Sequence, residues 1–344
     1  MKGILKQLYY NNFLPREEII ALLDNITEHM YPMLFEMAQS TVKRVYGNRI
    51  FIRGLMEFSN HCKNNCLYCG IRRNNKEVVR YRLSKTQILD SLKKAYNLGY
   101  KTFVLQSGED LYYTDRLLVE IIKEIKSKFP NTALTLSIGE RDFDEYEQFF
   151  NAGVDRFLLR HETATPSLYN MLHPNMNFEN RKNCLYNLKK IRYQTGAGFI
   201  VGLPNENNEV LADNLLFLKE LNPEMIGIGP LVPHPQTPLS HMKAGSIKKT
   251  LLLLALTRLF IPRALIPITS ALNTLDERGI EKGIKAGCNV LMLNLSPKSV
   301  KTKYEIYKGK EARDMYEIAA IKKKINAIGY VVDMSRGDHI DWLK

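Results

Sequence analysis

The sequence predicts an α/β fold, a closed (β/α)8 barrel of parallel strands, with a helical extension at the N-terminus and a further helix at the C-terminus. Strand-like and helix-like segments alternate along the chain, as in parallel βαβ units. Several helices are followed by a glycine before the next strand, as expected of a C-cap, at Gly99, Gly153 and Gly287. At 344 residues the chain is long for an average domain but normal for such a barrel. An open, doubly wound sheet is the alternative.

Each predicted strand is a short run of apolar, β-branched or small residues. The eight runs are at residues 51–58, 102–105, 133–137, 156–159, 196–201, 225–229, 266–270 and 288–293. Helical patterns lie between them at residues 85–98, 115–128, 143–152, 166–172, 178–193, 209–221, 247–260 and 276–286, and a last helix is expected at 315–328. We therefore expect one barrel domain, with N-terminal helices at 1–48, a barrel core at 49–296 and a C-terminal helical cap at 297–344.

Cysteine usage and hydropathy indicate a cytoplasmic protein. Five cysteines is an odd number and three of them lie within eight residues, which argues against a disulfide framework and for a reducing compartment. The first residues carry charges inside their apolar stretch, unlike a signal peptide. The longest apolar run, around residues 251–255, is far shorter than the ~20 residues that span a bilayer, so no membrane contact is expected.

The net charge is +13, which raises the question of an acidic partner. The lysines are spread over many predicted helices, and no basic block is interleaved with aromatic residues. A solvated, lysine-rich surface is therefore favoured over a nucleic-acid interface. A weak attraction for an acidic partner protein stays open.

Three cysteines, Cys62, Cys66 and Cys69, have the spacing C-x3-C-x2-C. A structural zinc site normally needs four ligands, often with a second pair further along the chain. Three thiolates can instead hold a 4Fe–4S cluster through three of its irons, which leaves the fourth iron for another ligand. Tyr68 completes the pattern C-x3-C-x-Φ-C, which resembles the radical S-adenosylmethionine (SAM) enzymes. In that superfamily the open iron is chelated by the amino and carboxylate groups of SAM. Zinc, or a chance group of buried thiols, is the alternative.

Polar residues recur where the predicted strands end. Chemistry in a barrel gathers at the carboxyl ends of its strands, and the cysteine loop follows the first one. The second strand ends in the polar run 106–110. Thr135 and Ser137 are two apart on the third strand and so face the same way, into the barrel. Such groups predict a solvated cavity, the alternatives being ordinary loops and a hydrogen-bonded core threonine.

The chain resembles the HydE family, the radical SAM maturases of iron-only ([FeFe]) hydrogenase, over residues 47 to 310. Biotin synthase and methylornithine synthase share the architecture, but RHETATP, PHPQTP and QSGED favour HydE. The motifs that carry the resemblance are EFSNHCKNNCLYCGIRRNN, RYRL, VLQSGED, TLSIGE, LLRHETATP, FENRKNC, TGAGFIVGLP, MIGIGPLVPHPQTPL, IPITSALNT and residues 287–294. Some HydE proteins carry further cysteines near the C-terminus for an accessory cluster, but residues 307–324 have none here. Cys184 and Cys288 lie apart in sequence, so we expect no second cluster, which also argues against biotin synthase activity.

The resemblance implies a role for each matching residue. Cys62, Cys66 and Cys69 would hold the cluster. The implied SAM-binding positions are Tyr68, Gln106, Gly108, Glu109, Ser137, Glu162 and Arg181. A carboxylate such as Glu162 can pair with the amino group or accept from ribose hydroxyls, and Arg181 can form a charge-assisted contact with the carboxylate. The implied substrate-side positions are Thr135, Arg160, Met225, Thr269, Met292 and Tyr307.

The reaction implied by the resemblance is the reductive cleavage of SAM to methionine and a 5′-deoxyadenosyl radical. The radical would act on a small iron–carbonyl–cyanide–cysteine species during assembly of the hydrogenase active-site cluster, under anaerobic conditions. The implied partners are this small substrate, a one-electron reductant such as a flavodoxin or ferredoxin, and the other hydrogenase maturases. Two alternatives stay open: a radical SAM enzyme that acts on an amino acid, as methylornithine synthase does, and a non-enzymatic iron–sulfur carrier.

Overall fold

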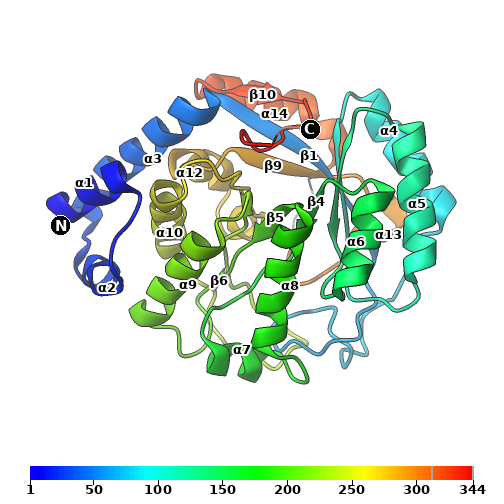
Figure 1. The fold of residues 1–344 in the computed structure, drawn as a ribbon, viewed down its shortest axis with the longest axis horizontal. Helices are drawn as coiled ribbons and strands as arrows, with labels where there is room; N and C mark the ends of the chain where they lie inside the picture. The colour runs from blue at the N-terminus through cyan, green and yellow to red at the C-terminus, as the bar shows by residue number, and fades with distance from the viewer. Residues whose placement is uncertain (311–312, 343–344) are drawn as a thin grey trace.

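The computed structural model describes residues 1–310 and 313–342 and shows parallel strands curved into a barrel with helices outside (Figure 1). The long strand β1 (Arg49–Ser59) pairs with β2 (Thr102–Ser107) on one side and with β9 (Val290–Asn294) on the other. From β2 the sheet continues in chain order through β3 (Ala133–Ser137), β4 (Arg156–Leu158), β5 (Gln194–Ala197) and β7 (Met225–Ile226).

Two single bridges close the ring between β7 and β9. Met225 pairs with Leu265, and Pro267 pairs with Val290, both in parallel. The predicted seventh strand is thus reduced to these two contacts, because Pro267 has no N–H to donate to a ladder. The expected barrel is confirmed, with its weakest strand at this place.

The fifth and sixth predicted strands are each broken in two. After β5 and β7 the chain bends, and a second parallel pair forms between β6 (Ile200–Val201) and β8 (Gly229–Pro230). Gly198 allows the bend: its φ is +149°, and a Cβ there would lie 2.0 Å from the carbonyl oxygen of Gly227. A side chain at 198 therefore cannot be accommodated, and the strands splay open toward the cavity described below.

Helices cover the outside of the barrel, and their starts follow capping signals in the sequence. Ser84 and Asp142 form capping boxes, and Thr114 caps its helix through its hydroxyl. The helices are α4 (Lys85–Asn97), α5 (Asp115–Lys128), α6 (Phe143–Ala152), α7 (Pro166–Leu172), α8 (Phe178–Ile191), α9 (Asn208–Leu221), α10 (Ile247–Phe260), α11 (Ser270–Leu275), α12 (Gly279–Lys285) and α13 (Lys298–Lys301). The expected helix at 276–286 is therefore shorter, and α11 begins where strand seven was expected to end.

The N-terminal helices pack on the outside of the barrel. They are α1 (Lys2–Asn11), α2 (Arg16–Asn25), the short 3₁₀ turn η1 (Glu28–Met30) and α3 (Tyr31–Tyr46), which confirms the helical extension (Figure 1). Of these, α1 and α3 lie against α10, and α2 lies against α9. Every residue of α10 from Thr250 to Phe260 is buried, because α3 covers the side that faces away from the barrel. This cover explains the longest apolar run of the sequence, which lies inside α10.

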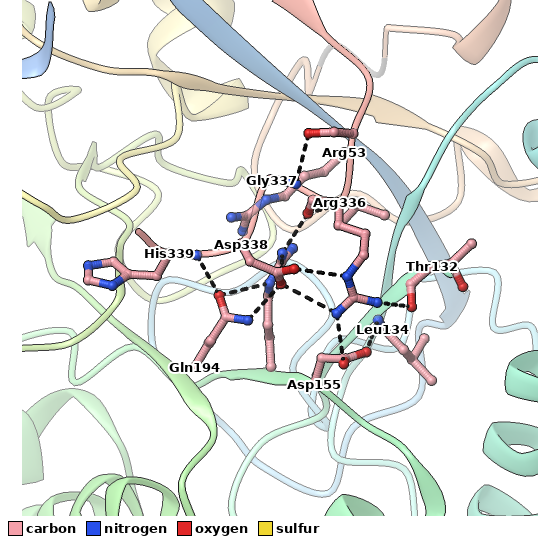
Figure 2. A network of polar contacts seen from close by, with 12 residues as sticks. Arg53, Thr132, Leu134, Asp155, Gln194, Arg336, Gly337, Asp338 and His339 are labelled. Carbon is pink, nitrogen blue, oxygen red and sulfur yellow. Dashed lines mark hydrogen bonds and ion pairs between the residues drawn. The ribbon is translucent and has the colours of Figure 1, made fainter. Parts of the chain in front are cut away.

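The C-terminal region is only partly the helical cap that was expected. After η2 (Met315–Glu317) and α14 (Ile318–Ala327) the chain forms a strand, β10 (Val331–Asp333), parallel to the start of β1. The tail then lies under the amino-terminal end of the barrel, where Arg336 bonds Asp155 and Asp338, and Asp338 accepts a hydrogen bond from Gln194 (Figure 2). Residues 311–312 and 343–344 of the expected cap lie outside the described residues. In the part of the chain that the structure describes, no helix has the length and apolar character needed to cross a bilayer.

Candidate active site at the carboxyl ends of the barrel strands

A cavity of about 380 Å³ opens at the carboxyl ends of the strands, as expected for this barrel. Its wall includes residues from the inner face of several strands and from the loops that follow them. Of the residues predicted from the sequence, those that line it are Cys66, Tyr68, Cys69, Gln106, Ser137, Arg160, Glu162, Arg181, Thr269, Met292 and Tyr307. Residues predicted to bind the cluster, SAM and the substrate thus line the same cavity.

The cysteine loop lies between β1 and α4 and is fixed by backbone hydrogen bonds to two other loops and to the end of α7. The amide of Lys63 donates to the carbonyl of Glu109 at 2.9 Å, and that of Leu67 donates to Leu172 at 2.9 Å. A third bond, from the amide of Gly70 to Ile306, is 2.8 Å long. The three cysteines on this loop are free and partly buried.

Gly108 explains how the cysteine loop can pack so closely on the end of β2. A Cβ atom at position 108 would lie 2.3 Å from the carbonyl oxygen of His61 and 2.7 Å from the Cβ of Cys62. Gly108 therefore sits under the loop instead of on the cavity wall. Its contribution is room for the cysteines.

The environment of the thiols fits a metal cluster. Burial, with the neighbouring Cys62, raises the pKa of Cys69 to about 12, and burial raises the pKa of Cys66 well above its ordinary value. Thiols of this kind become thiolates when a metal supplies positive charge. No three His, Cys, Asp or Glu side chains within the described ranges could hold one ion together, whereas a 4Fe–4S cluster needs its thiolates on separate irons.

Tyr68 is held in place by a buried histidine. Its hydroxyl lies 2.7 Å from Nε2 of His173, and Nδ1 of His173 lies 2.7 Å from the carbonyl oxygen of Tyr169. Because that carbonyl can only accept, Nδ1 carries the proton and Nε2 accepts from Tyr68. Burial lowers the pKa of His173 to about 3, so the ring is neutral. Sequence reasoning missed His173, which lies 105 residues away.

Arg160 and Glu162 face each other across the cavity wall. Nη2 of Arg160 lies 3.2 Å from Oε2 of Glu162 and donates to the carbonyl of Phe199 at 2.6 Å. The contact to Glu162 is an ion pair and not a hydrogen bond. Two buried atoms of the pair, Nε of Arg160 and Oε2 of Glu162, therefore lack hydrogen-bond partners among the described residues. Glu162 has a φ of +65°, a strained backbone for this residue type. Buried polar atoms without hydrogen bonds and a strained backbone are both typical of functional positions, which agrees with the ligand-binding role predicted for Glu162.

Arg181 is anchored from below by Glu140. Its Nε donates to Oε1 of Glu140 at 2.7 Å, and its Nη1 donates to the carbonyl of Arg160 at 2.6 Å. Asn180 and Tyr169 also donate to the carboxylate of Glu140. The guanidinium is thus pre-positioned on the cavity wall, with Glu140 as a partner whose pairing the sequence did not reveal.

Besides Gly108, four predicted residues are not on the cavity wall: Cys62, which lies on the cysteine loop beside Gly108, and Glu109, Thr135 and Met225. The Glu109 carboxylate accepts from the backbone amide of Glu140 at 3.0 Å and lies 3.2 Å from the ammonium of Lys63, so it braces the cysteine loop against the end of β3. Thr135 lies one inward-facing position below Ser137, and its buried hydroxyl has no hydrogen-bond partner among the described residues. The sulfur of Met225 lies 2.8 Å from Nη1 of Arg53, deeper in the barrel.

Cavity residues that the sequence did not single out are Glu57, Asn294 and Lys310. Glu57 is fully buried, forms an ion pair with Lys310 and accepts from Nδ2 of Asn294 at 2.9 Å. An acidic residue in the apolar run 51–58 was a signal for Glu57. No local pattern in the sequence pointed to Lys310, because its partner Glu57 is 253 residues away.

The remaining cysteines are not part of this cavity. Cys184 lies on α8 with its thiol 3.5 Å from the carbonyl oxygen of Arg141. Cys288 is completely buried just before β9. Neither lines the cavity wall in the described part of the chain.

Comparison with known proteins agrees with this site. Residues 56–218 match the radical SAM superfamily. The [FeFe] hydrogenase maturase subunit HydE of Thermotoga maritima is 45% identical over 86% of this chain and 85% of its own length. The 3-methylornithine synthase of Methanosarcina acetivorans is 28% identical over 80% of this chain and 78% of its own. A crystal structure of methylornithine synthase (PylB) has the same fold, with a TM-score of 0.84 over 96% of this chain and 97% of that one at 23% identity. The chain is a radical SAM enzyme that uses a 4Fe–4S cluster and SAM, and it belongs to the HydE family.

Proposed function

We propose that this protein acts in [FeFe]-hydrogenase maturation. It would cleave SAM reductively, and the resulting 5′-deoxyadenosyl radical would react with a small iron–carbonyl–cyanide–cysteine precursor. The observation that carries the proposal is the shared cavity, in which two of the three cysteines lie with Glu162, Arg160 and Arg181. The 45% identity to a HydE protein supports this reaction over others on the same scaffold.

The chain's own residues divide the cavity into two sides. Cys62, Cys66 and Cys69 would hold the cluster, which when bound supplies the electron that breaks the carbon–sulfur bond of SAM. Ser137, Glu162 and Arg181 would hold the charged and hydroxyl groups of SAM, with Tyr68 beside them. Hydrogen bonds to ionised groups are the stronger ones, so Glu162 and Arg181 would fix its orientation.

The substrate side would lie around Arg160, Thr269, Met292 and Tyr307. Thr269 caps α11 through its own hydroxyl, and the Tyr307 hydroxyl lies 2.5 Å from Oγ of Ser270. These bonds hold both residues in one conformation. A precursor that carries a carboxylate or cyanide would find the partly buried guanidinium of Arg160 on the cavity wall.

A maturation assay tests this function. The reconstituted protein, SAM, a reductant and the other two hydrogenase maturases are mixed with apo-hydrogenase, and hydrogen evolution is measured. We expect activity with this chain and none when it is left out. SAM cleavage without maturation would instead indicate another substrate, such as an amino acid. If neither SAM cleavage nor maturation is observed, the protein would be a non-enzymatic iron–sulfur carrier.

A further inference from the structure

The outer side of the cysteine loop carries a concentration of positive charge. Residues 61–82 include six lysines and arginines but one acidic residue, Glu77, which gives a net +5 out of +13 for the whole chain. This stretch is 22 of 344 residues. The stretch that contains the cluster ligands therefore carries a sizeable share of the chain's overall excess of basic residues.

The fold brings these charges onto the cysteine loop itself. The amide of Arg73 donates to the carbonyl of Asn64 at 2.8 Å, and Nη2 of Arg72 donates to that of Asn65 at 3.1 Å. Asn64 and Asn65 lie between Cys62 and Cys66 in the chain. Arg72 and Arg73 thus lie against the segment that joins two cluster ligands.

The surface is rigidly built. The guanidinium of Arg80 donates to four backbone carbonyls, those of Asn60, Ile71, Arg72 and Asn75, at 2.5 to 3.2 Å. This ties both ends of the basic stretch to the start of the cysteine loop. The backbone that carries the basic side chains is consequently held in place relative to the cysteines.

Part of this charge is uncompensated. Lys63 pairs with Glu109 and Arg82 with Asp110. Arg72, Arg73 and Lys76, in contrast, have no acidic partner among the residues that the structure describes, and Arg73 and Lys76 are exposed. An unpaired, exposed cation contributes fully to the local potential and attracts an acidic surface.

Exposed apolar side chains lie within this basic stretch and beside its last arginine, Arg82. Val79, Leu111 and Tyr112 have 64, 70 and 58% of their surface exposed. The guanidinium of Arg82 lies 4.8 Å from the ring centre of Tyr112, and Asp110 bonds Ser59 at the start of the loop. Aromatic and arginine side chains are enriched at protein interfaces, and exposed apolar groups beside charges are typical of transient ones. We call Arg72, Arg73, Lys76, Val79, Leu111 and Tyr112 the cluster-side surface.

We propose that the cluster-side surface docks an acidic one-electron carrier protein, the donor of the electron used in SAM cleavage. This rests on the proposed function, which consumes one electron for each SAM cleaved. The electron enters the cluster from the carrier, whose centre is oxidised by one electron. Electron transfer weakens steeply with distance, so the carrier must approach the cysteine loop. Its acidic face would meet the unpaired cations, and charge complementarity would guide docking.

The test compares two double variants with the same charge change. Arg73→Glu with Lys76→Glu replaces two positive charges of the cluster-side surface by negative ones. Lys322→Glu with Lys323→Glu makes the same charge change at two exposed lysines on α14. Binding of an acidic flavodoxin is measured directly by surface plasmon resonance at low and physiological salt. SAM cleavage is measured with flavodoxin and, separately, with dithionite, which needs no docking site.

We expect the first variant to lose about tenfold in flavodoxin affinity and in flavodoxin-driven cleavage, which is about 1.4 kcal/mol, and to keep dithionite-driven cleavage. The α14 variant should match the wild type in all three. Leu111→Ser removes only exposed apolar surface, so it should weaken flavodoxin binding without affecting folding.

Several results would overturn the docking proposal. If both double variants bind flavodoxin as tightly as the wild type, the surface has no role in docking. If both lose the same affinity, the effect comes from the net charge of the protein and not from this surface. Loss of dithionite-driven cleavage would mean that the surface supports the cluster instead. A single-stranded oligonucleotide that binds the wild type and not the first variant, with flavodoxin binding unchanged, would assign the surface to nucleic acid. Absence of dithionite-driven cleavage in the wild type would count against the proposed function, not against docking.

Discussion

The guanidinium of Arg160 lies 3.2 Å from the carboxylate of Glu162, and both side chains line the same cavity. The pair joins a residue assigned to the substrate with one assigned to SAM. Without a ligand, each is the other's counter-ion. We therefore expect that an anionic substrate at Arg160 and the amino group of SAM at Glu162 replace this mutual contact, and that the two ligands bind cooperatively.

Cys66→Ala should abolish stable cluster binding, because two thiolates rarely hold a 4Fe–4S cluster. Iron and sulfide content after anaerobic reconstitution, together with the thiolate-to-iron absorption, measure this. Cys184→Ala and Cys288→Ala are matched controls that should bind about four irons, as the wild type does. Loss of iron in either control would show that the ligand assignment is wrong.

Glu162→Gln should keep the cluster but weaken SAM binding by roughly thirtyfold or more, since truncating one partner of a buried charge pair costs about 2–5 kcal/mol. Arg181→Met should do the same, with an added loss of stability because Glu140 is left unpaired. Titration calorimetry with SAM measures the first effect and thermal unfolding the second. SAM affinity equal to that of the wild type in both variants would return these residues to structural roles.

Arg160→Met should leave the cluster and SAM cleavage in place and abolish hydrogenase maturation. The reason is that the guanidinium is the cationic group on the substrate side, while Glu162 remains for SAM. Arg160→Lys, which keeps the charge, should retain part of the maturation activity. If Arg160→Met stops SAM cleavage itself, Arg160 belongs to the cofactor site.

Asp338→Asn should destabilise the protein in a pH-dependent way. Burial opposes ionisation of Asp338, but Arg156 and Arg336 outweigh it and hold the pKa of the carboxyl well below its ordinary value. A carboxyl with a lowered folded-state pKa stabilises the fold above its unfolded-state pKa of about 3.9, and this stabilisation is lost as the pH falls through the folded-state pKa.

The free energy of unfolding should therefore drop by about 3 kcal/mol in Asp338→Asn at pH 7, since Arg156 is fully buried, and the difference from the wild type should shrink as the pH falls below about 4. Denaturant titrations at a series of pH values measure it. Asp341→Asn, in an exposed pair with Arg263, is the control and should change little. If the variant loses the same free energy of unfolding at every pH from 3 to 7, the ionised Asp338 carboxylate is not what stabilises the fold.

Local signals in the sequence predicted much of the barrel. The helices at 115–128, 143–152 and 247–260 have the predicted bounds because Thr114, Asp142 and Ser246 cap them. The rule that active sites lie at the carboxyl ends of barrel strands placed Gln106, Ser137 and Glu162 on one cavity.

The parts that the sequence did not predict depend on contacts between distant residues. Strand seven became two bridges because Pro267 cannot donate, and Thr269 starts a helix there instead. The strand β10 is short and partly exposed, so its residues carry no periodic pattern. The pairs Glu57–Lys310 and Arg181–Glu140 join different loops, and charged residues at such separations give no local signal of pairing.

We propose that one cavity holds both the cluster and SAM and that SAM is cleaved there. The most direct measurement is the amount of 5′-deoxyadenosine formed per chain when anaerobically reconstituted protein is mixed with SAM and dithionite. We expect 5′-deoxyadenosine from the wild type, none from Cys66→Ala and slower formation by Glu162→Gln at limiting SAM. No product from wild-type protein that carries a complete cluster, or equal amounts from Cys66→Ala, would contradict this proposal.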